Sequence, residues 1–216
     1  MLIVGHMGIT LGAAVLLSGV VARGYSIKTR QNGVKKYRAS SRRMSPAKNY
    51  PAAGRASWLI SLGNYVDVRL LLVGSLLPDI VDKPLGMVLL RDTLNNGRIF
   101  SHSLVFALLL TLAGFYIYWR HGKTWILALA FGAFTHLLLD EMWLDPRTLL
   151  QPLYGYIPPR GDSTYWISNI VYDLHTDPGT YIPEIVGAAI LTWFVVVLVR
   201  RKMVAAFIRS GKLYHS

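Results

Sequence analysis

The sequence predicts an all-α fold, a polytopic membrane bundle of helices, and three observations lead to that prediction. The 216 residues are 53% hydrophobic and only 16% charged, with a mean hydropathy of +0.38, which is too apolar for an ordinary soluble domain. Apolar runs that approach or reach membrane-spanning length recur along the chain. Basic residues gather at one end of those runs and acidic residues at the other. Residues 1–216 are therefore expected to form a single integral membrane domain.

Five apolar runs are expected to cross the membrane, with the N-terminus outside and the C-terminus inside. The first run, residues 2–22, is long enough for a hydrocarbon core of roughly 30 Å. The second run, residues 66–77, rises only about 18 Å as a helix and stops at Pro78. This topology makes residues 23–55 a cytoplasmic loop and residues 144–180 an outer loop. The other three runs are residues 101–119, 124–143 and 181–199.

The charge distribution supports this orientation. Ten of the 23 Lys and Arg residues lie between Arg23 and Arg55, in a stretch without any acid. Cytoplasmic loops carry such an excess of basic residues, so this stretch is expected to face anionic lipid headgroups, and nucleic acid is not expected as a partner. On this topology 18 of the 23 basic residues lie on the cytoplasmic side. Ten of the 11 acidic residues lie outside, and Asp67 is the exception.

Histidines and aspartates recur at the outer ends of these runs. Ionisable side chains are costly in lipid and usually serve a function there. The chain has no cysteine, so a metal ion would have to be held by His, Asp or Glu. Four of the runs bring such residues to one depth near the extracytoplasmic face. The candidate metal ligands are His6, Asp79, Asp82, His102, His136 and Asp140.

Each of these residues also has a simpler interpretation. His136 and Asp140 are four residues apart, which places them on one helix face, but this spacing is common by chance. Asp79 and Asp82 can be solvated acids at a helix end, and His102 can cap or pack the start of a helix. The histidine nearest the N-terminus can be incidental. The occurrence of all six at one depth is what favours a metal site.

Three histidines and three aspartates suit Zn²⁺ first, with Mn²⁺ and Fe²⁺ as alternatives. Six ligands can hold one ion or two, with Asp79 or Asp140 bridging a pair of ions. Three carboxylates buried together would repel one another, and a divalent cation removes that repulsion. One or two divalent metal ions are therefore the expected cofactor.

At these positions the chain resembles a family of bacterial and archaeal inner-membrane metal-dependent hydrolases, described as LexA-binding and as distant relatives of zinc-dependent phospholipase C. The resemblance covers residues 1–155 and implies a metal and a hydrolase activity, with little about what is cleaved. Many members have a DID box, so Asp82 is displaced here by one position. The matching features are the N-terminal His6, the LPD box of Leu77, Pro78 and Asp79 followed by Asp82, the R-x-x-[ST]-H-[ST] box of Arg98, Ser101, His102 and Ser103, the H-x-x-x-D pair of His136 and Asp140, and the Leu-Leu-x-Pro segment of Leu149, Leu150 and Pro152.

The function expected from these residues is a membrane-embedded metal-dependent hydrolase of the inner (plasma) membrane. It would cleave an ester, and first a phosphoester, of a lipid substrate at the extracytoplasmic face. The candidate catalytic residues are Arg98, Asp82 and Glu184. Arg98 beside His102 is placed to hold a phosphate oxygen, or it can snorkel to the outer interface. Glu184 is an extra ligand or a general base, or else an ordinary residue at a helix start.

Two functions of other classes stay open. A metal-ion or proton transporter would also place His and Asp inside the membrane, but it should show polar groups at both depths. The cytoplasmic half offers only Asp67 with Arg69. A non-catalytic membrane protein would use the basic loop at residues 23–55 to bind a cytoplasmic partner. The sequence leaves the oligomeric state open.

Overall fold

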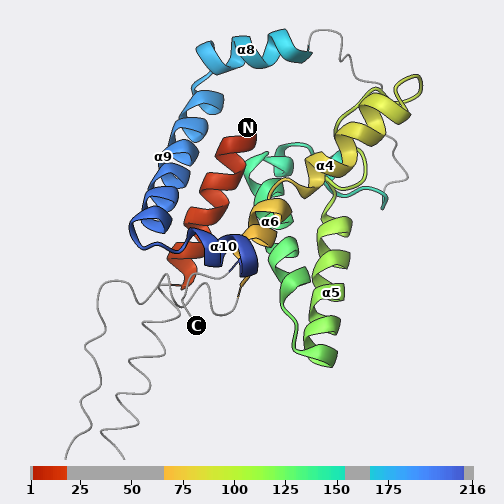
Figure 1. Ribbon diagram of the computed structural model, residues 1–216. Helices are drawn as coiled ribbons and strands as arrows, with labels where there is room; N and C mark the ends of the chain where they lie inside the picture. The colour runs from red at the N-terminus through yellow and green to blue at the C-terminus, as the bar shows by residue number, and fades with distance from the viewer. Residues whose placement is uncertain (1, 19–65, 154–165, 212–216) are drawn as a thin grey trace, which may run out of the picture.

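The structure of the chain is a computed structural model and describes residues 2–18, 66–153 and 166–211 (Figure 1). Within these ranges the regular secondary structure is entirely helical, as the sequence predicts. The basic loop expected at residues 23–55 lies outside the described residues. In chain order the elements are the N-terminal helix (Ile3–Ser18), α3 (Val68–Gly74), α4 (Leu77–Pro84), the π-helix η1 (Leu85–Leu89), α5 (Leu104–His121), α6 (Trp125–Leu139), the 3-10 helix η2 (Met142–Leu144), α7 (Pro146–Leu149), α8 (Trp166–Thr176), α9 (Pro178–Arg200) and α10 (Val204–Ser210).

The longer helices form a bundle, and the candidate site residues lie at one end of it. The N-terminal helix, α5 and α9 all run downward in Figure 1, and α6 runs upward between them. Helix α6 packs against both α3 and α5, so it lies inside the bundle. Helix α8 lies across the upper end, above the start of α9 (Figure 1). The candidate ligands of four separate segments are thereby brought to the same end.

Local capping fixes the hairpin of α5 and α6. The hydroxyl of Ser103 accepts a hydrogen bond from the N–H of Phe106 and so caps the start of α5. Helix α5 ends at Gly122, which has a φ of 65° in the left-handed region that glycine adopts without strain. The chain turns there and returns as α6. Because α5 and α6 are antiparallel, His102 before α5 meets His136 near the end of α6.

Glycines allow two pairs of helices to touch through their backbones. A Cβ atom on Gly8 would overlap the carbonyl oxygen of Gly187, so the N-terminal helix and α9 need glycine here. A Cβ atom on Gly132 of α6 would lie 2.5 Å from the backbone nitrogen of Ser75, just after α3. These close approaches hold the N-terminal helix against α9 and hold α6 against the turn that follows α3.

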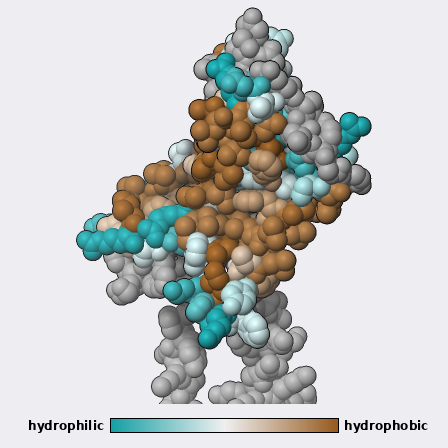
Figure 2. All heavy atoms as spheres, turned by 90° about the vertical axis from the view of Figure 1, so that its right-hand side faces the viewer, coloured by the Kyte–Doolittle hydropathy of each residue, from teal (hydrophilic) through white to brown (hydrophobic). Residues whose placement is uncertain are grey.

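The surface of the bundle is strongly apolar. On α5 the side chains of Leu109, Leu112 and Phe115 are exposed, and Trp119 is 86% exposed. Figure 2 shows hydrophobic atoms covering most of the coloured part of one face. An apolar surface of this extent indicates contact with lipid. The main core cluster joins the N-terminal helix, α3 and α9 through Leu11, Ala14, Val68, Leu71, Phe194, Leu198 and Met203.

Two helices, α5 and α9, are long and apolar enough to cross a membrane. Only 11% and 22% of their apolar windows are buried, which is unlike the core helices of a soluble protein. The N-terminal helix and α6 are apolar but shorter, at about 24 and 22 Å. The structure therefore supports a helical membrane protein, while the five crossings and the orientation stay predictions.

The structure differs from the sequence prediction in two segments. The expected second crossing, residues 66–77, contains only the short helix α3. This helix ends at Gly74, and a turn at Ser75 separates it from α4. Pro78 lies in the first turn of α4, where proline is well tolerated because its missing N–H needs no partner, so it does not end a helix. The expected outer loop, residues 144–180, contains α7 and α8, and α9 already begins at Pro178.

Candidate metal centre

His136 is held by the break between α3 and α4. Its side chain is fully buried, and its Nδ1–H donates to the carbonyl oxygen of Ser75 at 2.7 Å. That carbonyl is available because the chain leaves the regular helix at this point. With Nδ1 protonated, the lone pair of a neutral imidazole lies on Nε2. The break after α3 therefore decides which nitrogen of His136 can bind a cation.

His102 is held in the same way by Asp82. The Nδ1–H of His102 donates to Oδ2 of Asp82 at 2.8 Å, and both side chains are fully buried. The same carboxylate accepts backbone N–H groups from Ile99, Phe100 and Ser101, as well as that of His102. Burial would raise the pKa of Asp82, but these hydrogen bonds outweigh burial and lower the pKa to about 2. Asp82 is thus an ionised anchor for the segment before α5.

His6 completes the set of three imidazoles. Its Nδ1–H donates to the carbonyl oxygen of Leu2 at 2.8 Å, immediately before the N-terminal helix. Its Nε2 lies 3.1 Å from Oδ1 of Asp140, and this nitrogen is buried without a hydrogen-bond partner among the described residues. The ring stacks on His136 with centroids 4.1 Å apart. A buried nitrogen without a hydrogen bond calls for an explanation, and a cation supplies one.

The Nε2 atoms of His102 and His136 face one another at 3.3 Å. Two lone pairs at that distance repel unless a proton or a cation lies between them. Ligand atoms of a tetrahedral zinc site lie about 3.3 Å apart, because each is about 2.0 to 2.1 Å from the metal. The spacing of the two nitrogens therefore fits a shared metal ion.

Two carboxylates add negative charge to the same region. Oδ1 of Asp79 lies 3.5 Å from Nε2 of His102 and 3.9 Å from Nε2 of His136. Oδ2 of Asp140 lies 3.9 Å from Nε2 of His136 and 4.0 Å from Nε2 of His102. Ligand atoms of His6, His136 and Asp140 lie within 4.8 Å of one another, and so do those of Asp79, His102 and His136. Because His136 belongs to both groups, the arrangement can accommodate one ion or two.

Two cationic side chains lie at the edge of this cluster. Lys83 Nζ is 2.6 Å from Oδ2 of Asp79, four residues earlier on α4. Arg98 Nη2 is 2.7 Å from Oδ2 of Asp140. Both cations are partly exposed, at 38% and 47% of the side chain, whereas the two carboxylates are largely buried. The sequence prediction missed Lys83, although the spacing of Asp79 and Lys83 on one helix face is a signal that could have found it.

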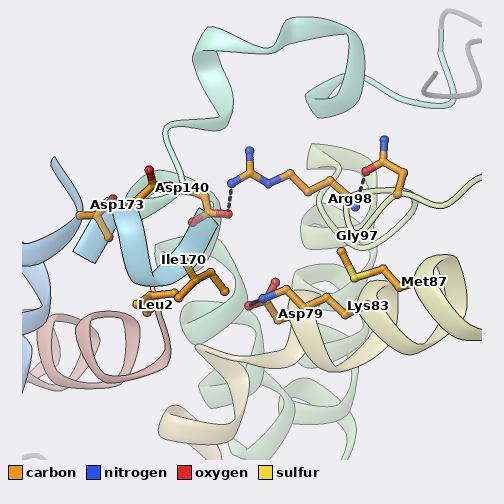
Figure 3. Close-up of a pocket in the computed structure, with 11 residues that line it drawn as sticks. Leu2, Asp79, Lys83, Met87, Gly97, Arg98, Asp140, Ile170 and Asp173 are labelled. Atoms are coloured by element: carbon orange, nitrogen blue, oxygen red, sulfur yellow. Dashed lines mark hydrogen bonds and ion pairs between the residues drawn. The ribbon is translucent and has the colours of Figure 1, made fainter. Parts of the chain in front are cut away.

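These residues line a pocket of about 310 Å³ that opens to the surface. Figure 3 shows Arg98 reaching towards Asp140 in the upper part of the view and Lys83 reaching towards Asp79 below them. Helix α8 contributes Ile170 and Asp173 to the wall. The remaining lining residues are Leu2, Met87, Asn96, Gly97 and Thr180. The pocket therefore joins the buried ligand cluster to an opening flanked by cations.

Glu184 lies on α9 and holds the start of the N-terminal helix. Its carboxylate accepts the N–H of Leu2 at 2.7 Å and the N–H of Gly5 at 3.0 Å. These are N–H groups that a helix start leaves without a partner inside the helix. Glu184 belongs to neither group of mutually close ligand atoms among the described residues. Its contacts are those of a residue that positions His6.

The structure brings some of the residues predicted from the sequence together and places others outside the cluster. It brings together five of the six predicted metal ligands, and it places Arg98 beside them. Asp82 lies behind His102, with its oxygens directed to N–H groups, and is in neither ligand group. Glu184 accepts N–H groups at the start of the N-terminal helix and is also in neither ligand group. The five residues brought together are His6, Asp79, His102, His136 and Asp140.

The fold and the site define an α-helical membrane protein with a buried histidine and aspartate cluster at one end of its bundle. The chain belongs to the YdjM inner membrane protein family, whose family model matches residues 47–211. No curated protein and no solved structure matches the chain. The family and the apolar helices together support association with the inner membrane.

Proposed function

We propose that this protein is a membrane-embedded metal-dependent hydrolase that cleaves a phosphoester of a lipid at the extracytoplasmic face. The observation that carries the proposal is the common arrangement of His6, His102 and His136. Each donates its Nδ1–H to a protein oxygen, which leaves Nε2 for a cation. Asp79 and Asp140 supply charge beside these nitrogens. This set of donors suits Zn²⁺ first, with Mn²⁺ and Fe²⁺ as alternatives.

The residues around the centre have distinct tasks in this reaction. A bound divalent cation would lower the pKa of a water molecule and polarise a phosphoryl oxygen. Arg98 and Lys83, at the edge of the pocket, hold phosphate oxygens and orient the phosphorus atom. Asp82 keeps His102 in the correct tautomer. In the overall reaction water adds its oxygen to phosphorus, and the displaced lipid oxygen leaves with a proton.

A lipid substrate is supported by the surface next to the pocket. Lys83 and Met87 line the pocket from α4 and η1. On the same continuous helical segment Ile80, Val88 and Leu89 are 53%, 72% and 75% exposed. Apolar side chains exposed beside a polar pocket favour a substrate that arrives through the lipid phase.

The contacts at the other end of the bundle favour a hydrolase over an ion transporter. There Asp67 and Arg69 form an ion pair of 2.7 Å, and Arg69 also donates to the carbonyl oxygen of Ile208. These groups are therefore engaged with each other and with the segment after α9. Polar groups engaged in this way support the hydrolase over the transporter, because a transporter needs polar groups that an ion can reach from both sides.

Turnover by the purified protein tests the proposal. The protein in detergent is supplied with Zn²⁺ and incubated with phospholipids and polyprenyl phosphates. We expect release of phosphate or of a phosphorylated headgroup, which a chelator stops and which the His136→Ala protein does not show. Release that persists in both controls, or no release from any lipid phosphoester, would contradict the proposal.

A further inference from the structure

The pocket beside the metal centre has an uneven distribution of charge. Its cations, Lys83 and Arg98, come from α4 and from the segment before α5. Its other wall comes from α8, which contributes Ile170 and Asp173. In Figure 3 Asp173 lies on the side of Asp140, across the pocket from Lys83 and Met87. The pocket therefore offers positive charge on one side and a carboxylate on the other.

Asp173 differs from the other two aspartates of the pocket. Asp79 is paired with Lys83, and Asp140 is paired with Arg98. The carboxylate of Asp173 has no hydrogen bond or ion pair with any residue that the structure describes. It is exposed on α8 and lines the pocket. A carboxylate in that position is available to a positive group on a bound molecule.

We infer that this pocket selects phosphodiester headgroups that carry an ammonium group, such as phosphoethanolamine. The inference rests on the proposed function, because it takes the phosphate of the headgroup to lie between the metal centre, Lys83 and Arg98. The ammonium group then lies against Asp173. A headgroup with one negative and one positive charge matches this lining better than a headgroup that is only negative.

The size of the pocket fits a headgroup rather than a whole lipid. About 310 Å³ is at the lower end of the range for small-molecule sites, so the acyl chains remain outside. The exposed apolar side chains of Ile80, Val88 and Leu89 provide the surface along which those chains can lie. The same chemistry could also be presented by a free phosphodiester in solution, so a test has to separate the two sources.

Equilibrium binding tests this inference independently of turnover. The probes are glycerophosphoethanolamine and glycerophosphoglycerol, two soluble phosphodiesters that differ in the ammonium group. The proteins are the wild type, Asp173→Asn, the charge-conserving Asp173→Glu, and Asp92→Asn as a matched control on the exposed connector after η1. Binding is followed by NMR in detergent, and the metal content of each sample is measured in parallel.

We expect the wild type to bind the ammonium-bearing probe roughly fivefold more tightly than the other, as one partly solvated charge pair would produce. Asp173→Asn should lose this preference, while Asp173→Glu and Asp92→Asn should keep it. A wild type without preference, or a preference that survives in Asp173→Asn, would overturn the inference. If the wild type shows no preference although its metal content is normal, the inference about the ammonium group fails while the metal centre stands.

A second arm identifies the source of the headgroup. The same titration is repeated in nanodiscs of phosphatidylethanolamine and of phosphatidylglycerol. Weaker binding of glycerophosphoethanolamine in the first nanodisc than in the second shows that the lipid headgroup occupies the pocket. Equal binding in both, with the preference kept, shows that the pocket takes the free phosphodiester. Loss of the preference in both nanodiscs would overturn the selection of an ammonium group.

Discussion

The carboxylate of Asp82 accepts the Nδ1–H of His102 at 2.8 Å while it also accepts the backbone N–H groups of Ile99, Phe100 and Ser101. One buried side chain therefore fixes both the ring of His102 and the segment that carries it. Because this segment leads directly into α5, the tautomer of the histidine and the start of the helix depend on the same carboxylate. Asp82 can therefore act on the candidate metal centre through His102.

The first prediction concerns Asp82→Asn. The amide offers one acceptor oxygen instead of two, and its NH₂ group faces N–H donors that it cannot satisfy. We expect zinc affinity to fall roughly 10- to 100-fold, as when the partner of a ligating histidine is removed. Chelator competition measures this affinity, with Asp92→Asn as the control. Unchanged affinity would show that His102 is not held by Asp82 in the working protein.

The second prediction separates a positioning role of Glu184 from a catalytic one. In Glu184→Gln one of the two N–H groups of Leu2 and Gly5 loses its carboxylate acceptor, so the N-terminal helix and His6 are held less firmly. We expect weaker metal binding and a loss of lipid hydrolysis that excess Zn²⁺ restores. Activity is measured across a zinc titration. A loss that saturating zinc leaves in place, with the metal bound, would assign Glu184 to the chemical step.

The third prediction tests the contact between the N-terminal helix and α9. In Gly8→Ala the new Cβ meets the backbone of Gly187, which cannot move aside, so we expect a loss of about 1 to 3 kcal/mol in stability. Gly12→Ala lies one turn further along the same helix, where the new Cβ meets only the end of the Ile190 side chain at 3.0 Å. That variant should change stability by less than about 1 kcal/mol.

Unfolding in detergent measures both glycine variants, together with their zinc content. The Gly8→Ala protein should also hold less zinc, because His6 moves with the helix. Equal behaviour of the two variants would mean that the helices do not touch at Gly8 and Gly187.

The fourth prediction concerns the two cations of the pocket. Arg98→Ala and Lys83→Ala should each lower kcat/KM for a lipid phosphoester roughly tenfold or more, because a charged hydrogen bond to phosphate is lost. Zinc should be retained or bound more tightly, since each cation is paired with a candidate ligand, Asp140 or Asp79. Arg91→Ala, exposed after η1, is the control. Loss of zinc in either variant would make that cation a structural part of the centre.

Much of the site could be predicted from the sequence because its ligands lie at the ends of apolar runs. The pair His136 and Asp140 follows from helix periodicity, and His102 follows from its place before an apolar run. Helix periodicity could not predict which groups each carboxylate faces. Asp79 faces the imidazoles and Asp82, three residues later on the same short helix, faces the backbone of another segment.

The fold was predictable in class and less so in detail. Apolar composition predicts membrane helices, but the end of α3 before Ser75 lies against Gly132 of α6, a contact between segments distant in sequence that composition does not reveal. Helix α8 was also missed, because its 11 residues mix apolar and polar side chains and are too few to cross a membrane. That helix supplies Ile170 and Asp173 to the pocket wall, so one wall of the pocket could not be predicted from the sequence.

The metal content of the purified protein is the most direct test of the candidate metal centre. Wild type, His136→Ala and His121→Ala are compared by elemental analysis, since His136 belongs to both ligand groups and His121 lies exposed at the end of α5. We expect one or two equivalents of zinc, or of manganese or iron, in the wild type and in His121→Ala, and little in His136→Ala. Metal absent from the wild type, or fully retained in His136→Ala, would contradict this expectation.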